Sequence, residues 1–72
     1  MIVGDENIKK GDFVRIAGGR FWRRWNCCVF TVMAEPVKVP YGTDTYIFVD
    51  IWCPLTGKRF ERFRAIDLKI VD

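Results

Sequence analysis

Strict period-two alternation over Thr45–Cys53 constrains the fold of this chain more than any other feature. One face of the segment carries Ile47, Val49, Ile51 and Cys53, and the other carries Tyr46, Phe48, Asp50 and Trp52. Alternating β-branched and aromatic residues are typical of a β-strand. No stretch of ten residues has helical periodicity. We therefore expect an all-β protein.

Four further segments have the character of short strands. They cover about residues 12–17, 27–39, 58–63 and 68–71. Gly18-Gly19 ends the first of them, and Pro36 marks an edge or a bend in the second. Reverse turns are expected at residues 40–44 and 54–57, and residues 64–67 resemble one tight helical turn. Five short strands joined by tight turns predict a closed or nearly closed barrel, because closure removes exposed edges.

Three motifs resemble the SH3-like small barrels, a group that includes KOW-type, Tudor-type and many short phage and bacterial proteins. They are IKKGDFVRIAGG at 8–19, TGKRFERF at 56–63 and AIDLKIVD at 65–72. The group commonly has a Gly-Asp-x-Val-Arg-Ile first strand and a single helical turn before a last strand of the form Asp-Leu-x-x-Val. The resemblance covers residues 8–72. It implies one domain over 1–72, namely a five-stranded SH3-like barrel with one short 3-10 turn before the last strand and an N-terminal arm at 1–8.

The chain departs from two subgroups of these barrels. KOW-type sequences usually have glycine at the start of the second strand, where this chain has Cys27-Cys28. The spacing of the aromatic residues does not define the cage of a methyl-reading Tudor domain. The chain therefore most resembles the short phage and bacterial barrels. Barrels of this kind bind RNA, DNA, peptides or other subunits, so the resemblance implies binding without naming a ligand.

The residue types exclude most catalytic chemistry. The chain has no histidine, and its carboxylates have no paired spacing. Three cysteines cannot form a four-cysteine metal site. Gly18-Gly19 is not followed by a helix, as a phosphate loop would require. We expect no enzyme activity, no cofactor and no metal.

The cysteines and the hydropathy profile indicate a cellular compartment. Cys27 and Cys28 are adjacent, so on a strand they point to opposite faces, in or near the core. With Cys53 the count is odd, which favours reduced thiols over a disulfide framework. There is no secretory signal and no apolar run of the ~20 residues that cross a bilayer. We expect a cytoplasmic protein of a bacterial cell or a phage-infected host, with no membrane partner.

Basic charge is concentrated in two blocks, although the net charge is only +3. Residues 15–24 hold four arginines and no acid. Residues 58–64 hold four cations and one acid, Glu61. If the fourth strand curves towards the first block, the two form one surface for an anionic partner. If they lie on opposite sides, they are ordinary solubility charges, and the sequence leaves both arrangements open.

The segment Arg20–Asn26 is the strongest candidate for a binding site, because it interleaves aromatic and arginine side chains. Tryptophan and arginine are enriched at protein–protein hot spots and also stack on bases and contact phosphates. In the alternative interpretation, Phe21, Trp22 and Trp25 fold back as a lid on one end of the barrel. Trp22 and Arg23 are the first choices for contact residues. The full set of predicted partner-binding residues is Arg20, Trp22, Arg23, Arg24, Trp25, Arg59 and Arg62.

An aromatic stripe on the third strand, formed by Tyr46, Phe48 and Trp52, is the other candidate surface. The opposite face of that strand already supplies the interior, so the stripe would be a large exposed apolar patch. Either the arm covers the stripe with Ile2, Val3 and Ile8, or the chain self-associates there.

These observations predict a non-catalytic binding module, present as a monomer or a weak homodimer. The leading hypothesis is a protein–protein accessory factor anchored by the Arg/Trp-rich loop, because the net charge is modest. The alternative is a nucleic-acid-binding barrel that binds RNA or DNA through the same loop, with Arg59, Arg62 and Arg64 contacting phosphates. The second alternative is a structural subunit that self-associates through the aromatic stripe.

Overall fold

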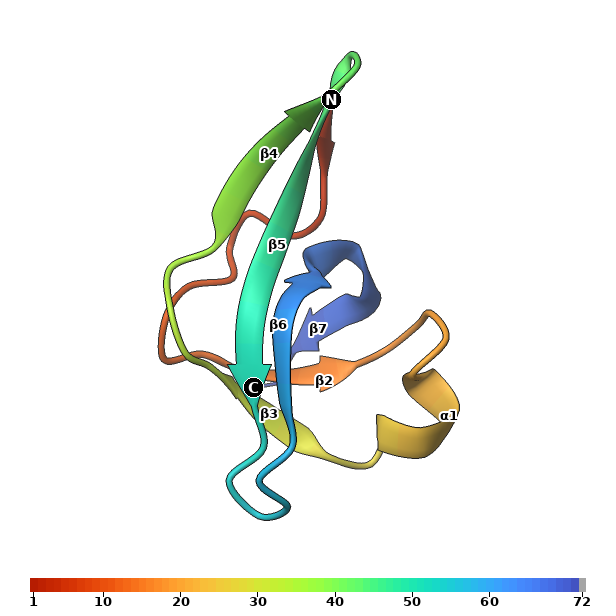
Figure 1. Cartoon of the computed structure of the whole chain (residues 1–72), viewed down its shortest axis with the longest axis vertical. Coiled ribbons are helices and arrows are strands. Elements are labelled where there is room, and N and C mark those ends of the chain that lie inside the picture. Colours follow the sequence, from red (N-terminus) through yellow and green to blue (C-terminus); the bar gives the residue numbers. More distant parts are fainter. Residues whose placement is uncertain (72) are drawn as a thin grey trace.

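A computed structural model describes residues 1–71 and confirms an all-β fold (Figure 1). The elements in chain order are β1 (Ile2–Val3), β2 (Phe13–Ile16), α1 (Trp22–Trp25), β3 (Val29–Val32), β4 (Val37–Tyr41), β5 (Asp44–Trp52), β6 (Arg59–Arg64), the 3-10 turn η1 (Ala65–Asp67) and β7 (Leu68–Ile70). The expected single 3-10 turn before the last strand is therefore confirmed.

The long strand β5 organises the sheet, because every other strand except β2 and β7 pairs with it. Its first half pairs with β4 on one edge and with β1, in parallel, on the other. Its second half pairs with β3 and β6. Strand β2 lies between β3 and β7. The sheet consequently curls into a half-barrel, with the β4–β5 hairpin projecting from one end (Figure 1).

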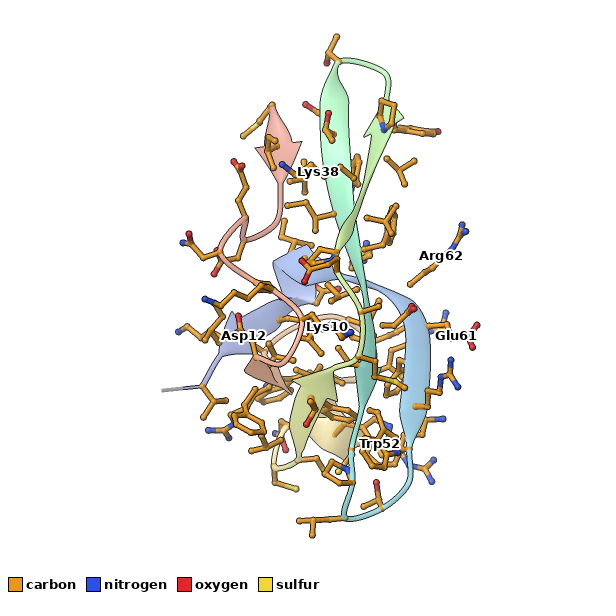
Figure 2. All side chains as sticks on the ribbon, turned by 90° about the vertical axis from the view of Figure 1, so that its left-hand side faces the viewer. Lys10, Asp12, Lys38, Trp52, Glu61 and Arg62 are labelled. Carbon is orange, nitrogen blue, oxygen red and sulfur yellow. The ribbon has the colours of Figure 1, made fainter. Side chains whose placement is uncertain are left out.

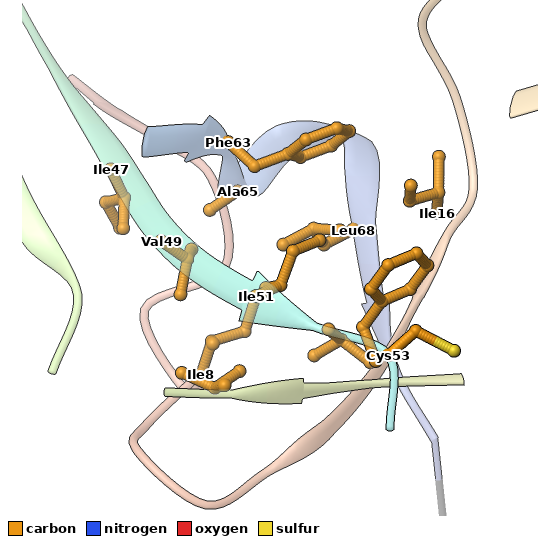
Figure 3. Close-up of a cluster of buried hydrophobic side chains, with 12 residues drawn as sticks. Ile8, Ile16, Ile47, Val49, Ile51, Cys53, Phe63, Ala65 and Leu68 are labelled. Carbon is orange, nitrogen blue, oxygen red and sulfur yellow. The ribbon is translucent and has the colours of Figure 1, made fainter. Parts of the chain in front are cut away.

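The concave side of the sheet holds one hydrophobic core (Figure 3). The predicted inner face of β5 is confirmed, since Ile47, Val49, Ile51 and Cys53 are all buried. Ile8, which precedes the first predicted strand, joins this core with 3% of its surface exposed. Ala65 of η1 and Leu68 of β7 close the core. The N-terminal segment is thus an integral part of the fold.

A β-bulge in β6 explains how two phenylalanines three residues apart both face the core. Ile51 is opposite Phe60 and Val49 is opposite Phe63, with a register shift between the two pairs. Arg62 adopts φ 53°, in the left-handed region, and its N–H donates to Asp50 Oδ1 at 2.9 Å. The bulge turns the Arg62 side chain away from the ribbon (Figure 2). The predicted core role of Phe60 and Phe63 is confirmed.

The prediction of five strands is wrong: the described residues contain seven. One extra strand arises because the predicted strand at 27–39 is two strands, separated around Pro36. The other is β1, which the arm contributes beside β5. The predicted turn at 40–44 is shorter than expected, because β4 reaches Tyr41 and β5 begins at Asp44.

No helix among residues 1–71 is long and apolar enough to cross a membrane.

Candidate functional site

The predicted loop at Arg20–Asn26 contains a short helix, α1, at the end of the molecule away from the hairpin tip (Figure 1). The N–H of Asn26 donates to the Trp22 carbonyl at 2.9 Å, and the N–H of Trp25 donates to the Phe21 carbonyl at 3.1 Å. One helical turn of this length is not stable by itself in water. Tertiary packing of its aromatic side chains must therefore hold it.

The turn that leads into α1 is fixed by Asp67 of η1. Gly19 has φ +82°, and a Cβ at this position would lie 2.8 Å from Asp67 Oδ2. The same carboxylate oxygen accepts two hydrogen bonds from Arg64, at 2.8 Å from Nη2 and 3.2 Å from Nε. The close approach of Gly19 to Asp67 thus brings the segment that begins at Arg20 beside the end of β6.

Two of the three aromatic residues in this segment pack on the core. The ring of Phe21 lies 4.9 Å from that of Phe60, between centroids. The ring of Trp25 lies 6.2 Å from Phe60 and 6.4 Å from Phe30. These rings form an aromatic cluster at the end of the half-barrel. The lid interpretation is therefore correct for Phe21 and Trp25.

Trp22 does not join the aromatic cluster. Its side chain is 45% exposed and lines a different cleft, on the other side of α1. Trp22 and Trp25 are only three residues apart on one turn, but their surroundings differ. The helix packs on the aromatic cluster through Trp25, whereas Trp22 lines the cleft. Trp22 is consequently the one tryptophan of the segment with much of its indole free.

Several cations of the two basic blocks stack on the aromatic cluster. The guanidinium carbon of Arg20 lies 5.0 Å from the Phe21 ring centroid, and that of Arg24 lies 5.5 Å from the Trp25 ring. Lys58 Nζ lies 4.8 Å from the Phe60 ring and 5.8 Å from the Trp25 ring. Cation–π contacts of this kind orient a cation without neutralising it. The cluster is thus a platform that presents positive charge.

We call the surface over this platform the α1 face. It comprises the stacked cations Arg20, Arg24 and Lys58, together with Arg23 of α1 and with Arg62, which lines a cleft beside Arg20, and all five are exposed. Within residues 1–71, none of the five forms a salt bridge. The acidic residues that do form ion pairs bind the N-terminus, Lys38, Arg59 and Arg64.

The two basic blocks meet in a cleft of about 480 Å³, which we call the Arg20 cleft. Its lining residues are Arg20, Phe21, Phe60, Glu61, Arg62, Phe63, Arg64 and Asp67. Of the two acids in the cleft, Asp67 binds Arg64 and Glu61 binds Arg59 at 3.2 Å. Of the two arrangements that the sequence leaves open, the structure therefore has the merged one.

A second cleft, of about 540 Å³, lies on the other side of α1, and we call it the Trp22 cleft. Its lining residues are Arg15, Ile16, Ala17, Trp22, Asn26, Cys27, Lys69, Ile70 and Val71. Arg15 Nη2 donates to the Asn26 carbonyl at 3.0 Å, which ties β2 to the end of α1. Arg15 and Lys69 are not among the site residues predicted from the sequence. The regular polar positions of a strand carry no local signal of a cleft.

Other predicted site residues lie apart from the α1 face. Arg59 is opposite Trp52 in the sheet register and pairs with Glu61. Tyr46 and Phe48 are half-buried on the hairpin, while Trp52 lies at the far end of β5 and is exposed. The arm does not cover this stripe as a lid: Ile8 is in the core and β1 runs beside β5.

The cysteines are three free thiols with different exposure. Cys27 is exposed in the Trp22 cleft, Cys28 is half-buried and Cys53 is buried. Burial, together with the neighbouring Cys27 and Cys53, raises the pKa of the Cys28 thiol. Hydrogen bonds from the turn that follows, above all from the Thr56 side chain, lower the pKa of Cys53. No cluster of potential metal ligands is present among residues 1–71.

Charge is segregated along the 37 Å length of the molecule. The hairpin end and the arm carry Asp44, Asp5, Glu6 and Glu35, with Lys38 paired to Glu6 and the N-terminus paired to Asp44. The opposite end carries α1 with Arg20, Arg23 and Arg24, while Arg62 lies between the ends and also lines a pocket with Glu35 and Asp50. The small net charge therefore conceals a concentration of basic residues around α1.

No family model, curated protein or solved structure matches this chain.

Proposed function

We propose that this chain is a non-catalytic module that binds nucleic acid through the α1 face. One observation carries the proposal: Arg20, Arg24 and Lys58 stack on one aromatic platform, none of them forms a salt bridge within residues 1–71, and the same short helix carries a half-exposed tryptophan, Trp22. Arginine and lysine neutralise phosphates, and an exposed indole stacks on bases. Both kinds of contact are available on one end of the molecule.

The segregation of charge supports a polyanionic partner more than the net charge alone suggests. A dense patch of one sign attracts an oppositely charged ligand even when the total charge of the protein is small. Asp5, Glu6, Glu35 and Asp44 lie on the hairpin and the arm, and the two acids of the Arg20 cleft, Glu61 and Asp67, are paired with Arg59 and Arg64. The cations stacked on the aromatic cluster therefore keep their charge available to a ligand.

This order of hypotheses differs from the expectation based on the sequence alone, in which a protein partner came first. Two observations support the change. The basic blocks line one cleft, and Trp25 packs on Phe30 and Phe60, so it is less available as a protein hot spot. Trp22 remains exposed, so its indole can stack on a base or pack against a protein side chain.

A salt titration tests the proposed function. The affinity for fluorescently labelled, mixed-sequence oligonucleotides is measured by anisotropy at several salt concentrations. Contacts with phosphates predict a log–log slope of about −0.7 per contact on single strands and about −0.9 on duplex. We expect binding that weakens steeply with salt. Absence of binding at low salt, where phosphate contacts are strongest, would contradict the proposal.

A protein partner is the second candidate, and the β4–β5 hairpin favours it. Val37, Val39 and Tyr41 are exposed by 56%, 37% and 76%. They share one face with the half-buried Tyr46 and Phe48, as the sheet register requires. Contiguous apolar patches of this kind mark protein contacts in many proteins. Sedimentation across a range of concentrations distinguishes self-association at this face from a monomer that awaits a different partner.

We also propose that the fold is of the SH3-like type and that the protein acts in a bacterial or phage-infected cytoplasm. The strand order β6-β5-β3-β2-β7 supports the fold proposal, since the first and last of the five predicted strands, β2 and β7, pair side by side, with the expected 3-10 turn η1 before β7. Three free thiols support a reducing compartment.

A further inference from the structure

The Trp22 cleft combines features that the binding of phosphates alone does not require. Trp22 forms one wall with an indole that is 45% exposed, although its neighbours Phe21 and Trp25 are packed on the aromatic cluster. Its exposed surface contributes little to folding, because only apolar area that is removed from water stabilises. An indole held in this position by α1 can stack on a planar ligand without large rearrangement.

Two cations stand on the rim of the same cleft. Arg15 and Lys69 are directly opposite each other on β2 and β7. Like charges in direct cross-strand positions destabilise a sheet. Among the described residues 1–71, none that lines the cleft is acidic, and the Arg15 guanidinium is instead held by the Asn26 carbonyl at 3.0 Å. An anion between Arg15 and Lys69 would relieve this repulsion.

The size and lining of the cleft fit one nucleotide. Its volume of about 540 Å³ is within the range of roughly 300–1,000 Å³ found for small-molecule sites. Ile16 faces the core and Ile70 packs against it, so Ala17 and Val71 supply apolar lining, and Asn26 lines the cleft at the end of α1. A base against Trp22 with its phosphate near the two cations would use every one of these groups.

We propose that the Trp22 cleft binds one unpaired nucleotide of a single strand, with the base stacked on Trp22 and the phosphate held by Arg15 and Lys69. This inference rests on the proposed function, in which the α1 face contacts the neighbouring phosphates. A duplex does not fit the cleft, because its bases already stack on one another and expose no free face. The chain therefore prefers single strands over duplex of the same length and sequence.

The test uses a labelled oligodeoxythymidylate of about ten nucleotides, within the range of single-strand site sizes. Its affinity for the full chain and for Trp22→Ala and Trp22→Phe is measured by anisotropy. We expect Trp22→Ala to weaken binding about 5- to 150-fold, the effect of one lost base stack. Trp22→Phe keeps a ring for stacking and should retain most of the affinity. A cooperative thermal melting transition of each variant confirms that it is folded.

Alkylation of Cys27 with iodoacetamide, mapped by mass spectrometry, reports occupancy of the cleft independently of affinity. Cys27 is exposed in the cleft, so the bound strand should slow its modification. A matched duplex and thymidine monophosphate are tested in parallel. The duplex should not protect Cys27. Strong protection by the monophosphate without binding of the oligomer would assign the cleft to a free nucleotide and overturn the single-strand proposal.

Failure of this inference is distinguishable from failure of the proposed function. Equal binding of duplex and single strand, with no effect of Trp22→Ala and no protection of Cys27, would overturn the cleft proposal and leave the α1 face intact. Loss of affinity in Arg15→Gln/Lys69→Gln, with a salt slope shallower by about 0.7 for each lost contact, would support it. Binding of no nucleic acid at all would overturn both.

Discussion

Gly19 lies directly against the carboxylate of Asp67, so closely that a Cβ at position 19 would be 2.8 Å from Oδ2. This contact joins the turn before α1 to the 3-10 turn before β7. Because Asp67 also binds Arg64, a single carboxylate sets the distance between the two basic blocks. The arrangement of the α1 face thus depends on glycine at position 19.

Substitution of Gly19 by alanine is expected to destabilise the fold and distort the α1 face. The positive φ alone costs about 1–2 kcal/mol for an L-residue, and the contact with Asp67 adds to it. Gly57→Ala is the matched control, since Gly57 has φ +75° with nothing within 4 Å of the added Cβ. Urea unfolding of both variants gives the comparison. Equal losses of stability would mean that the contact with Asp67 imposes no constraint.

Arg62→Gly is expected to separate stability from binding. Glycine adopts the left-handed φ at this bulge without strain, although it has more entropy to lose on folding. We expect the free energy of unfolding to stay the same or rise by up to about 1 kcal/mol, while the affinity for an oligonucleotide falls. Asp50→Ala removes the acceptor of the Arg62 N–H and should destabilise by about 1 kcal/mol. If the Arg62→Gly variant were less stable and bound the oligonucleotide with unchanged affinity, this account of the bulge would be wrong.

The two tryptophans of α1 should respond differently to truncation. Trp25→Ala removes a half-buried ring that contacts Phe30 and Phe60, and it should cost about 2–4 kcal/mol. Trp22→Ala should cost about 1 kcal/mol or less, because much of its indole is exposed. Chemical denaturation measures both. A larger loss for Trp22→Ala would mean that Trp22, too, belongs to the lid.

Alternation alone identifies the all-β class and the inner face of β5, because each buried side chain there obeys the two-residue period. The extra strands are harder to predict. Pro36 indicates a bend, but only the pairing of both parts with β5 makes residues 29–32 and 37–41 separate strands. The helix α1 has no sequence signal of its own, since a four-residue helix depends on the rings beneath it.

The sequence predicts only part of the candidate site. The Arg20–Asn26 segment stands out by composition, so most of the α1 face is recognisable in advance. The convergence of the two basic blocks depends on the curl of the sheet and on the contact between Gly19 and Asp67, which join residues distant in sequence. Arg15 and Lys69 become neighbours only through the pairing of β2 with β7.

Thiol reactivity should follow the order Cys27, Cys28, Cys53. Cys27 is exposed and reacts first under native conditions. Cys28 reacts more slowly, because its raised pKa lowers the thiolate fraction at mildly alkaline pH. Cys53 has a lowered pKa but is buried, so it should react only as the protein unfolds. Timed alkylation with peptide mapping gives the order, and rapid modification of Cys53 in the folded protein would contradict the packing described for the core.

A comparison of two charge-matched variants tests the central claim most directly. Arg23→Gln/Arg24→Gln removes two charges from the α1 face, and Lys9→Gln/Lys10→Gln removes two charges near the opposite end of β2. Anisotropy with the same single-stranded oligonucleotide should give a loss of about tenfold or more for the arginine variant, with a salt slope shallower by about 0.7 per lost contact. The lysine variant should stay within about threefold of the unmodified chain. Equal losses in the two variants, or no loss in either, would contradict binding through the α1 face.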